Sequence, residues 1–310
     1  MNTNRSLPDL SIKKIWNKLF KHDNDIEVLQ ERPVNNNILI NSNFANPVNQ
    51  RGITPSTWER AQYGLDRWIL GDIYGISVKS IDANGITISH GTDTGVIIGQ
   101  KIDLSEIDMS SKYTYSVYAN GKVRTFTKDL SEFTVGVNKS LATGQDEDRF
   151  FLYVAYKPSL GWISFDICAY QENSDFTIKW AKLEKGDHAT PYVPRLYDEE
   201  FQICQRYYCT SYSQQKGFGY VGGISENGIS ICQMFEFPVE MRIAPTVRIY
   251  SSIDGTVNCV VSWSGNTNVG AGKMGANSIT NKSFLISSAQ NNVLTAGRGY
   301  YFSYTADAEL

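Results

Sequence analysis

Side chains that could carry out catalysis are few and scattered in this chain of 310 residues. None of its three histidines, His22, His90 and His188, belongs to a motif that would join it to a nucleophile. Two acidic runs, Asp146–Asp148 and Glu199–Glu200, could hydrolyse a glycoside only if they faced a cleft at a suitable separation. Both runs are polar and favour solvated loops. We therefore expect a protein that binds its target and is not an enzyme.

The composition argues against several classes of binding partner and favours one class of fold. The net charge is only −3, with 20% charged residues, and no basic patch indicates nucleic-acid binding. No apolar stretch has the length of a membrane-spanning helix, and the first residues, MNTNRSLPDL, lack the apolar core of a signal peptide. Aromatic residues are abundant at 12%, and glycine and asparagine are common. Such a composition favours strands joined by tight turns, and so an all-β protein.

Five cysteines are present, and their spacing fits no metal site. They are Cys168, Cys204, Cys209, Cys232 and Cys259. Because the number is odd and no paired motif occurs, we expect buried free thiols. Cys168 ends an alternating run in which it shares its parity with Trp162, Ser164 and Asp166.

The segment 37–194 contains the strands that would position any binding site. Alternating runs surround Asn84-Gly85 and Asn120-Gly121, which are strong hairpin signals. Further runs lie at 150–156, 162–170 and 176–183. About eight short strands in this length fit a single antiparallel β-sandwich or jelly roll.

The segment 195–310 is predicted to form a smaller β-rich domain. Phe201, Cys204 and Tyr208 have nearly helical spacing, which is compatible with a short helix or an irregular connector. Strands are expected near 217–221, 229–237, 246–250, 257–263 and 300–305. The glycine- and asparagine-rich stretch 266–275 is predicted to be a loop.

Residues 1–36 are predicted to form a helical attachment segment and a linker. Ile12, Ile15, Trp16, Leu19 and Phe20 follow helical spacing, with lysines mostly on the other side. The pattern is too short for a robust coiled coil. Docking to a partner protein or between copies of the chain is preferred over local packing or membrane-surface binding.

Four motifs, in this order, resemble a family of bacteriophage tail-fibre and receptor-binding proteins. They are Asn43-Phe44 with Gln50-Arg51-Gly52 and Asp66-Arg67-Trp68, then the run from Trp180 to Tyr192, then FQICQRYY at 201–208, and finally the run from Arg298 to Leu310. The first two resemble the opening and the closing strand of a β-sandwich that is similar to carbohydrate-binding modules. The last two resemble the connector and the final strand of phage fibre tips.

The resemblance implies a virion protein, assembled in the cytoplasm of a bacterial host, that binds a host surface glycan during attachment without turnover. Its partners would be that glycan and, through residues 1–36, other virion proteins. A similar terminal domain forms trimers in phage fibres, so a homotrimer is expected. The alternative is a structural fibre or decoration protein of the capsid or collar without receptor binding. Both kinds of protein reuse the same modules.

If the resemblance holds, exposed aromatic side chains would stack on sugar rings. The candidates in segment 37–194 are Trp58, Tyr63, Tyr74, Tyr113 and Trp162. The candidates in segment 195–310 are Tyr212, Tyr220 and Trp263. The alternative for each of them is a place in a hydrophobic core.

Three features within the motifs are assigned to structure. Trp68 and Trp180 lie in apolar runs and are expected in the core, and Asp66-Arg67 fits a structural ion pair better than a sugar clamp.

Related modules often hold a structural calcium near the first strand. The matching stretch Asn41–Asn46 contains no acidic residue, which puts calcium in doubt, and no cofactor is expected.

Overall fold

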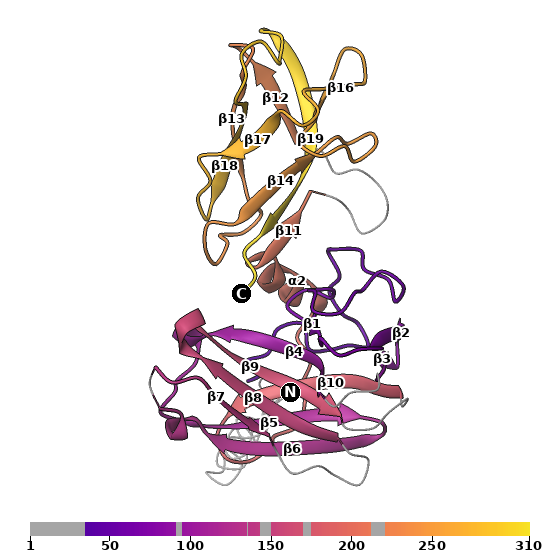
Figure 1. The fold of residues 1–310 in the computed structure, drawn as a ribbon, viewed down its shortest axis with the longest axis vertical. Coiled ribbons are helices and arrows are strands. Elements are labelled where there is room, and N and C mark those ends of the chain that lie inside the picture. Colours follow the sequence, from indigo (N-terminus) through magenta and orange to yellow (C-terminus); the bar gives the residue numbers. More distant parts are fainter. Residues whose placement is uncertain (1–34, 91–94, 135, 143–149, 170–174, 212–220) are drawn as a thin grey trace, which may run out of the picture. The chain divides into compact units, whose positions relative to one another are not determined.

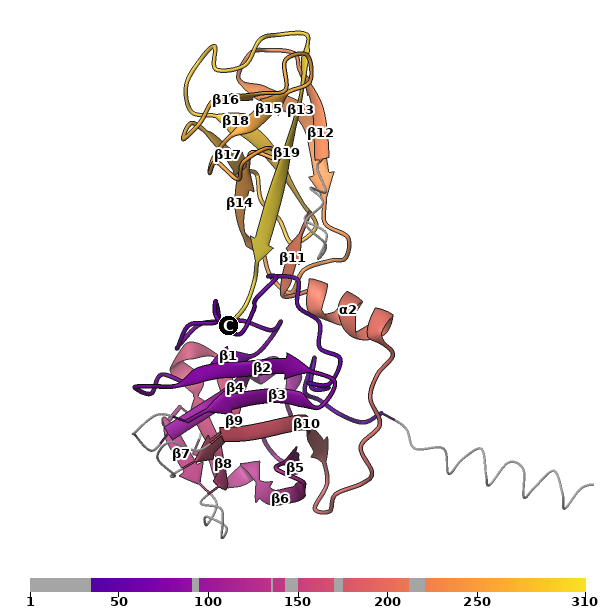
Figure 2. The same cartoon turned by 90° about the vertical axis from the view of Figure 1, so that its right-hand side faces the viewer.

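Alternation of apolar and polar residues produces the two five-stranded antiparallel sheets that contain the candidate site. The computed structural model describes residues 35–90, 95–134, 136–142, 150–169, 175–211 and 221–310. The first sheet has the order β1 (Ile69–Leu70), β4 (Gly95–Asp103), β9 (Trp162–Ala169), β8 (Phe150–Lys157), β7 (Lys139–Ala142) (Figure 1). The second has the order β2 (Ser77–Asp82), β3 (Gly85–Ser89), β10 (Asp175–Lys185), β5 (Lys112–Ala119), β6 (Lys122–Asp129) (Figure 2).

One hydrophobic cluster takes residues from both of these sheets. Ile163, Phe165 and Ile167 of β9 belong to it, as do Tyr115 and Val117 of β5. The rings of Tyr115 and Phe165 meet edge to face, with their centroids 5.8 Å apart. Each sheet therefore turns one face to a shared core, as the period of two along its strands requires.

The predicted hairpins are confirmed at both Asn-Gly pairs. β2 and β3 join through Ala83 and Asn84, with Asp82 opposite Gly85, and β5 and β6 join through Asn120 and Gly121. Asn120 and Gly121 have φ values of 48° and 77°. Two successive positive φ values match the right-handed twist of the flanking strands, which is why this dipeptide favours a two-residue hairpin.

Single 3₁₀ turns connect several of these strands, and one α-helix is present among the described residues. The turns are η1 (Leu104–Glu106), η2 (Leu130–Glu132) and η3 (Pro158–Leu160). The helix is α2 (Tyr197–Gln205), which contains Phe201 and Cys204 but ends before Tyr208, so the predicted helical spacing is confirmed for two of the three residues. Its first turn carries three acidic residues, which favour the positive end of the helix dipole. No helix in the described ranges has the length and apolar character needed to cross a membrane.

The C-terminal strands form two further antiparallel sheets around a second core. In one sheet β19 (Arg298–Asp307) pairs with β11 (Tyr208–Thr210), β12 (Val221–Ser225), β14 (Thr246–Tyr250) and β15 (Val260–Ser262), and β15 also pairs with β16 (Thr267–Val269). The other has the order β13 (Ser230–Glu236), β18 (Ser283–Ser288), β17 (Met274–Asn277). Phe235, Phe284 and Phe302 join the two sheets in an aromatic cluster.

The prediction of a loop over 266–275 is wrong. This stretch contains β16 and the first residues of β17. Asn266, Gly270 and Gly272 have positive φ values, so the glycines and asparagines serve the turns that flank β16. Short strands between tight turns leave too few alternating residues for the pattern to be recognised.

Of the described chain, Asn35 and Pro191–Val193 form a unit separate from the rest, in which the Asn35 side-chain amide donates to the carbonyl of Val193 at 2.8 Å. All other described residues belong to one unit. The predicted domain boundaries at 36/37 and 194/195 stay a prediction.

The thiols are buried at four of the five cysteines, and Cys232 on β13 is exposed. Burial raises the pKa of Cys168, Cys204, Cys209 and Cys259 above the usual thiol value. None of the five forms a disulfide, but the exposed Cys232 contradicts the expectation that the free thiols are buried. The buried thiols therefore pack as small apolar groups of low reactivity.

Candidate functional site

The outer face of the first sheet carries a band of polar and aromatic side chains. On β9, Trp162, Ser164 and Asp166 alternate with the core residues and point away from the core. Their neighbours in register on β4 and β8 are Asp103 and Lys157, Lys101 and Ala155, and Gly99 and Tyr153, respectively. Three adjacent strands therefore contribute side chains to one surface.

A cavity of about 450 Å³, here called the sheet-face pocket, lies on this surface. Its lining includes small residues that leave room above the strands, namely Ala61, Gly71, Gly99, Ser140, Ala155 and Ser164. Larger side chains also line it, namely Asp72, Lys101, Tyr153, Lys157, Trp162 and Asp166. Because small residues on neighbouring strands are flanked by long ones, the sheet is locally concave. The volume falls in the range of small-molecule binding sites.

Asp166 is the buried carboxyl group of the pocket, with 7% of its surface exposed. Its carboxylate accepts a hydrogen bond from the Ser164 hydroxyl at 2.8 Å. Burial raises the pKa of Asp166 to about 7, and the Ser164 hydrogen bond and the charge of Lys101 oppose this rise. A Cβ atom on Gly99 would lie 1.9 Å from Oδ1 of Asp166. Because Gly99 has no side chain, it leaves the space that the Asp166 carboxylate occupies.

The charge of Lys101 interacts both with this carboxylate and with the indole ring of Trp162. Its Nζ lies 4.9 Å from the centre of the Trp162 ring and donates to the carbonyl of Leu310 at 3.0 Å. Burial lowers the pKa of Lys101, whereas the charge of Asp166 raises it. Trp162 is half-buried, so the cation–π contact positions its ring while part of the ring remains accessible.

The pocket brings together an aromatic ring, hydroxyls, an ammonium group and a carboxyl group. The negative face of an indole ring attracts the C–H groups on the face of a sugar. Ser164, Tyr153 and Asp166 offer hydrogen-bonding atoms to ring hydroxyls, and Lys101 and Lys157 add donors. A ligand that is flat and apolar on one side and rich in hydroxyls around its edge fits this combination.

Trp162 is the residue predicted from sequence that lies in the sheet-face pocket. Trp58 and Tyr113 are buried, with 4% and 3% of their surface exposed. The Trp58 indole N–H donates to the carbonyl of Gln62 at 2.9 Å, and the Tyr113 hydroxyl accepts from the Asp108 backbone N–H at 2.9 Å. Their rings belong to the core cluster, so neither offers a free face to a ligand.

The remaining described candidates lie outside the pocket lining. The half-buried Tyr63 donates its hydroxyl proton to the carbonyl of Leu310 at 2.8 Å. Tyr74 is exposed over 71% of its surface and Trp263 over 59%. Trp263 lies against Gly299, where a Cβ atom would come within 2.4 Å of the indole ring. Trp263 is therefore a separate exposed aromatic surface on the C-terminal sheets.

Several predictions fall on residues outside the described ranges. They concern Tyr212 and Tyr220, the acidic run Asp146–Asp148, and the helical pattern from Ile12 to Phe20.

The structural assignments made within the motifs have mixed outcomes. Trp68 is fully buried, which confirms its place in the core, whereas Trp180 is half-buried and stacks on Tyr118 with ring centroids 5.9 Å apart. Asp66 and Arg67 are in ion pairs, but their partners are Arg51 and Glu309. A pair of Asp66 with Arg67 themselves is therefore replaced by two separate pairs.

The stretch Asn41–Asn46 is organised by an amide side chain. Asn41 donates through its side-chain amide to the carbonyls of Val48 and Asp66, at 2.8 and 2.9 Å, and accepts from the Val48 N–H at 2.7 Å. In the part of the chain that the structure describes, no group of three or more His, Cys, Asp or Glu side chains could hold a metal ion.

Sequence reasoning missed most residues of the pocket. The shared parity of Trp162, Ser164 and Asp166 was a usable signal, because polar residues at every second position of an apolar strand indicate a functional outer face. Gly99 and Lys101 lie on β4, whose sequence GVIIGQKID has no clean alternation. Tyr153 was within a predicted strand and Lys157 was expected in the turn after it, but nothing in that strand alone indicated which face would be hollow.

Comparison of the chain with protein-family models, with curated protein sequences and with solved structures found no match.

Proposed function

We propose that this protein binds a glycan through the sheet-face pocket and does so without chemical turnover. The observation that carries the proposal is the half-buried Trp162 beside a buried carboxyl group in a concave, hydroxyl-lined surface of about 450 Å³. Sugars are recognised by stacking on an aromatic ring together with a few convergent polar groups.

The finer description of the fold belongs to the same proposal. The two five-stranded sheets would be a jelly-roll sandwich similar to carbohydrate-binding modules, and the C-terminal sheets would be a fibre-tip domain. The protein would then be a receptor-binding or tail-fibre component of a bacteriophage virion, attached through its N-terminal segment and assembled as a homotrimer. Three copies would raise the avidity of weak sugar sites by orders of magnitude. The motifs described above support this reading.

Replacement of Trp162 by alanine is expected to weaken glycan binding by about tenfold or more. Stacking on an aromatic ring contributes about 1–3 kcal/mol if the range known for nucleic-acid bases applies to sugars. Binding of the fluorescently labelled full-length protein would be measured on a panel of bacterial strains, and then by calorimetry with polysaccharide purified from a strain that is bound. Release of reducing sugar, measured in the same samples, would reveal any turnover.

Tyr74→Ala is the matched control, because Tyr74 is an exposed aromatic residue outside the pocket lining. Its binding should equal that of the unmodified protein. Unchanged binding by a Trp162→Ala protein with an unchanged melting temperature would remove the sheet-face pocket from the proposal. Failure of the unmodified protein to bind any strain would favour the alternative of a structural fibre or decoration protein.

A further inference from the structure

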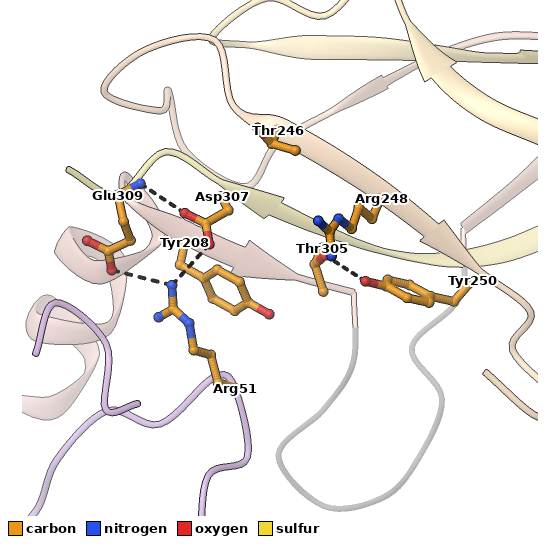
Figure 3. Close-up of a pocket in the computed structure, with 8 residues that line it drawn as sticks. All are labelled: Arg51, Tyr208, Thr246, Arg248, Tyr250, Thr305, Asp307 and Glu309. Carbon is orange, nitrogen blue, oxygen red and sulfur yellow. Dashed lines mark hydrogen bonds and ion pairs between the residues drawn. The ribbon is translucent and has the colours of Figure 1, made fainter. Parts of the chain in front are cut away.

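A second hollow, here called the polar groove, lies on the C-terminal sheet and has a volume of about 480 Å³. β14 contributes Thr246, Arg248 and Tyr250, and β19 contributes Thr305 and Asp307. In the antiparallel register Thr246 is opposite Asp307 and Arg248 is opposite Thr305, so these side chains lie on one face. Figure 3 shows them projecting from the two neighbouring strands, with Tyr208 of β11 and Arg51 beside them.

The side chains on the opposite face of the same strands pack in the core. Ile249 of β14 and Tyr304 and Ala306 of β19 are buried in the C-terminal hydrophobic cluster. Thr246, Arg248, Tyr250, Thr305 and Asp307 therefore lie on the face of these strands that is turned away from that cluster.

Arg51 is one of two arginines in the polar groove, and neighbouring acidic side chains already balance its charge. Its guanidinium lies 3.3 Å from Asp66, 3.4 Å from Asp307 and 3.5 Å from Glu309. It also lies 3.7 Å from the centre of the Tyr208 ring. These contacts hold Arg51 rigidly, so we assign it a structural role at one end of the groove.

Arg248 differs from Arg51 in every one of these respects. It is exposed, and its guanidinium forms no ion pair or hydrogen bond with any residue that the structure describes. Hydroxyl groups surround it, since Thr305 is its neighbour in register and the Tyr250 hydroxyl lies 3.4 Å from the Thr305 hydroxyl. A planar guanidinium of this kind binds carboxylate or phosphate oxygens in a bidentate manner.

The end of the polar groove where Arg51 lies also offers an acceptor. The side chain of Asp307 is 47% exposed although its carboxylate also contacts Arg51. It can therefore accept a hydrogen bond from a ligand hydroxyl. Along the two strands the groove thus runs from Asp307 and Thr246, through Arg248 and Thr305, to Tyr250. A ligand with one anionic group and several hydroxyls matches this combination of one unpaired cation, hydroxyls and an acceptor.

We propose that the polar groove is a second binding site, which takes a sugar bearing a carboxylate or a phosphate. Arg248 holds the anionic group, Thr246, Thr305 and Tyr250 bond the ring oxygens, and Asp307 accepts from a hydroxyl. This site shares no residue with the sheet-face pocket. An experiment that contradicts this second site would therefore leave the function proposed above unaffected, and the reverse also holds.

The test measures binding of three sugars of the same ring type to the full-length protein by calorimetry at low ionic strength. The probes are glucuronate, glucose 6-phosphate and glucose. At least one anionic sugar is expected to bind about tenfold or more tightly than glucose, because a charge-assisted pair strengthens binding. A preference for glucuronate would identify a carboxylated glycan as the source, and a preference for glucose 6-phosphate a phosphorylated one.

Arg248→Gln should abolish the preference for the anionic sugar with no change in melting temperature, because Arg248 is exposed and unpaired. Arg298→Gln, at an exposed arginine of β19 outside the groove lining, should retain the preference. Trp162→Ala should also retain it. Equal binding of all three sugars, or a preference that survives Arg248→Gln, would overturn the proposal.

Discussion

Replacing Glu309 with glutamine is expected to lower the free energy of unfolding by about 3–5 kcal/mol. The Glu309 and Arg67 side chains are 3% and 1% exposed and form an ion pair with each other. The Arg67 guanidinium also donates to the carbonyl of Lys101 and lies 3.7 Å from the centre of the Tyr207 ring. Glutamine would leave this guanidinium buried without a balancing charge. Urea unfolding of the two proteins, followed by tryptophan fluorescence, measures the difference.

The control uses the same substitution in an exposed ion pair. Glu240 and Lys282 are 3.4 Å apart with side chains 57% and 68% exposed, so Glu240→Gln should cost at most about 1 kcal/mol. Replacing both buried partners with apolar residues, Arg67→Met with Glu309→Leu, should recover much of the loss. A loss from Glu309→Gln no larger than that from Glu240→Gln would show that the buried pair contributes little.

The second large effect is a change in the pH dependence of stability in Asp166→Asn. Burial raises the pKa of Asp166 from 3.8 to about 7. Between these values the unfolded chain loses the proton while the folded protein keeps it, so ionisation destabilises the fold as pH rises. Three pH units at about 1.4 kcal/mol each give a cost of about 4 kcal/mol above pH 7. Asparagine keeps the side-chain volume and accepts from Ser164 but cannot ionise.

We therefore expect the stability of Asp166→Asn, relative to the unmodified protein, to increase by about 3 kcal/mol from pH 5 to pH 8. Urea unfolding at both pH values measures this. Asp175→Asn, at the exposed start of β10, is the control for replacing a surface carboxyl group and is measured alongside. A stability difference for Asp166→Asn that stays constant between the two pH values would contradict the raised pKa.

Strands could be predicted from the sequence where the alternation of apolar and polar residues and the turn residues both indicate the same hairpin. The hairpin at Asn120-Gly121 combines alternation with the turn residues that this geometry requires, and the alternating runs on either side of Ala83-Asn84 form the other predicted hairpin. β4 and β18 were missed. Their sequences, GVIIGQKID and SFLISS, give too little regular alternation to be told from other apolar runs. These strands are recognisable only through their partners, since β4 pairs with β9 over most of its length.

The candidate site was predicted only in part for a related reason. Trp162 was named because aromatic residues in strands are candidates for stacking, but Trp58 and Tyr113 met the same criterion and are buried. Burial depends on which strands become neighbours, and a single sequence does not show this. The hollow above Gly99 arises from three strands in register, and the ion pair of Arg67 with Glu309 joins residues that are 242 positions apart.

The single exposed thiol makes the unmodified chain suitable for site-specific labelling. Cys232 is accessible on β13, whereas the other four cysteines are buried and burial disfavours their reactive thiolate forms. A maleimide dye should therefore attach once per folded chain without any engineered cysteine. Counting photobleaching steps of that dye in single particles would give the number of copies in an assembly, and energy transfer between two dyes would report how far apart the copies hold their β13 strands.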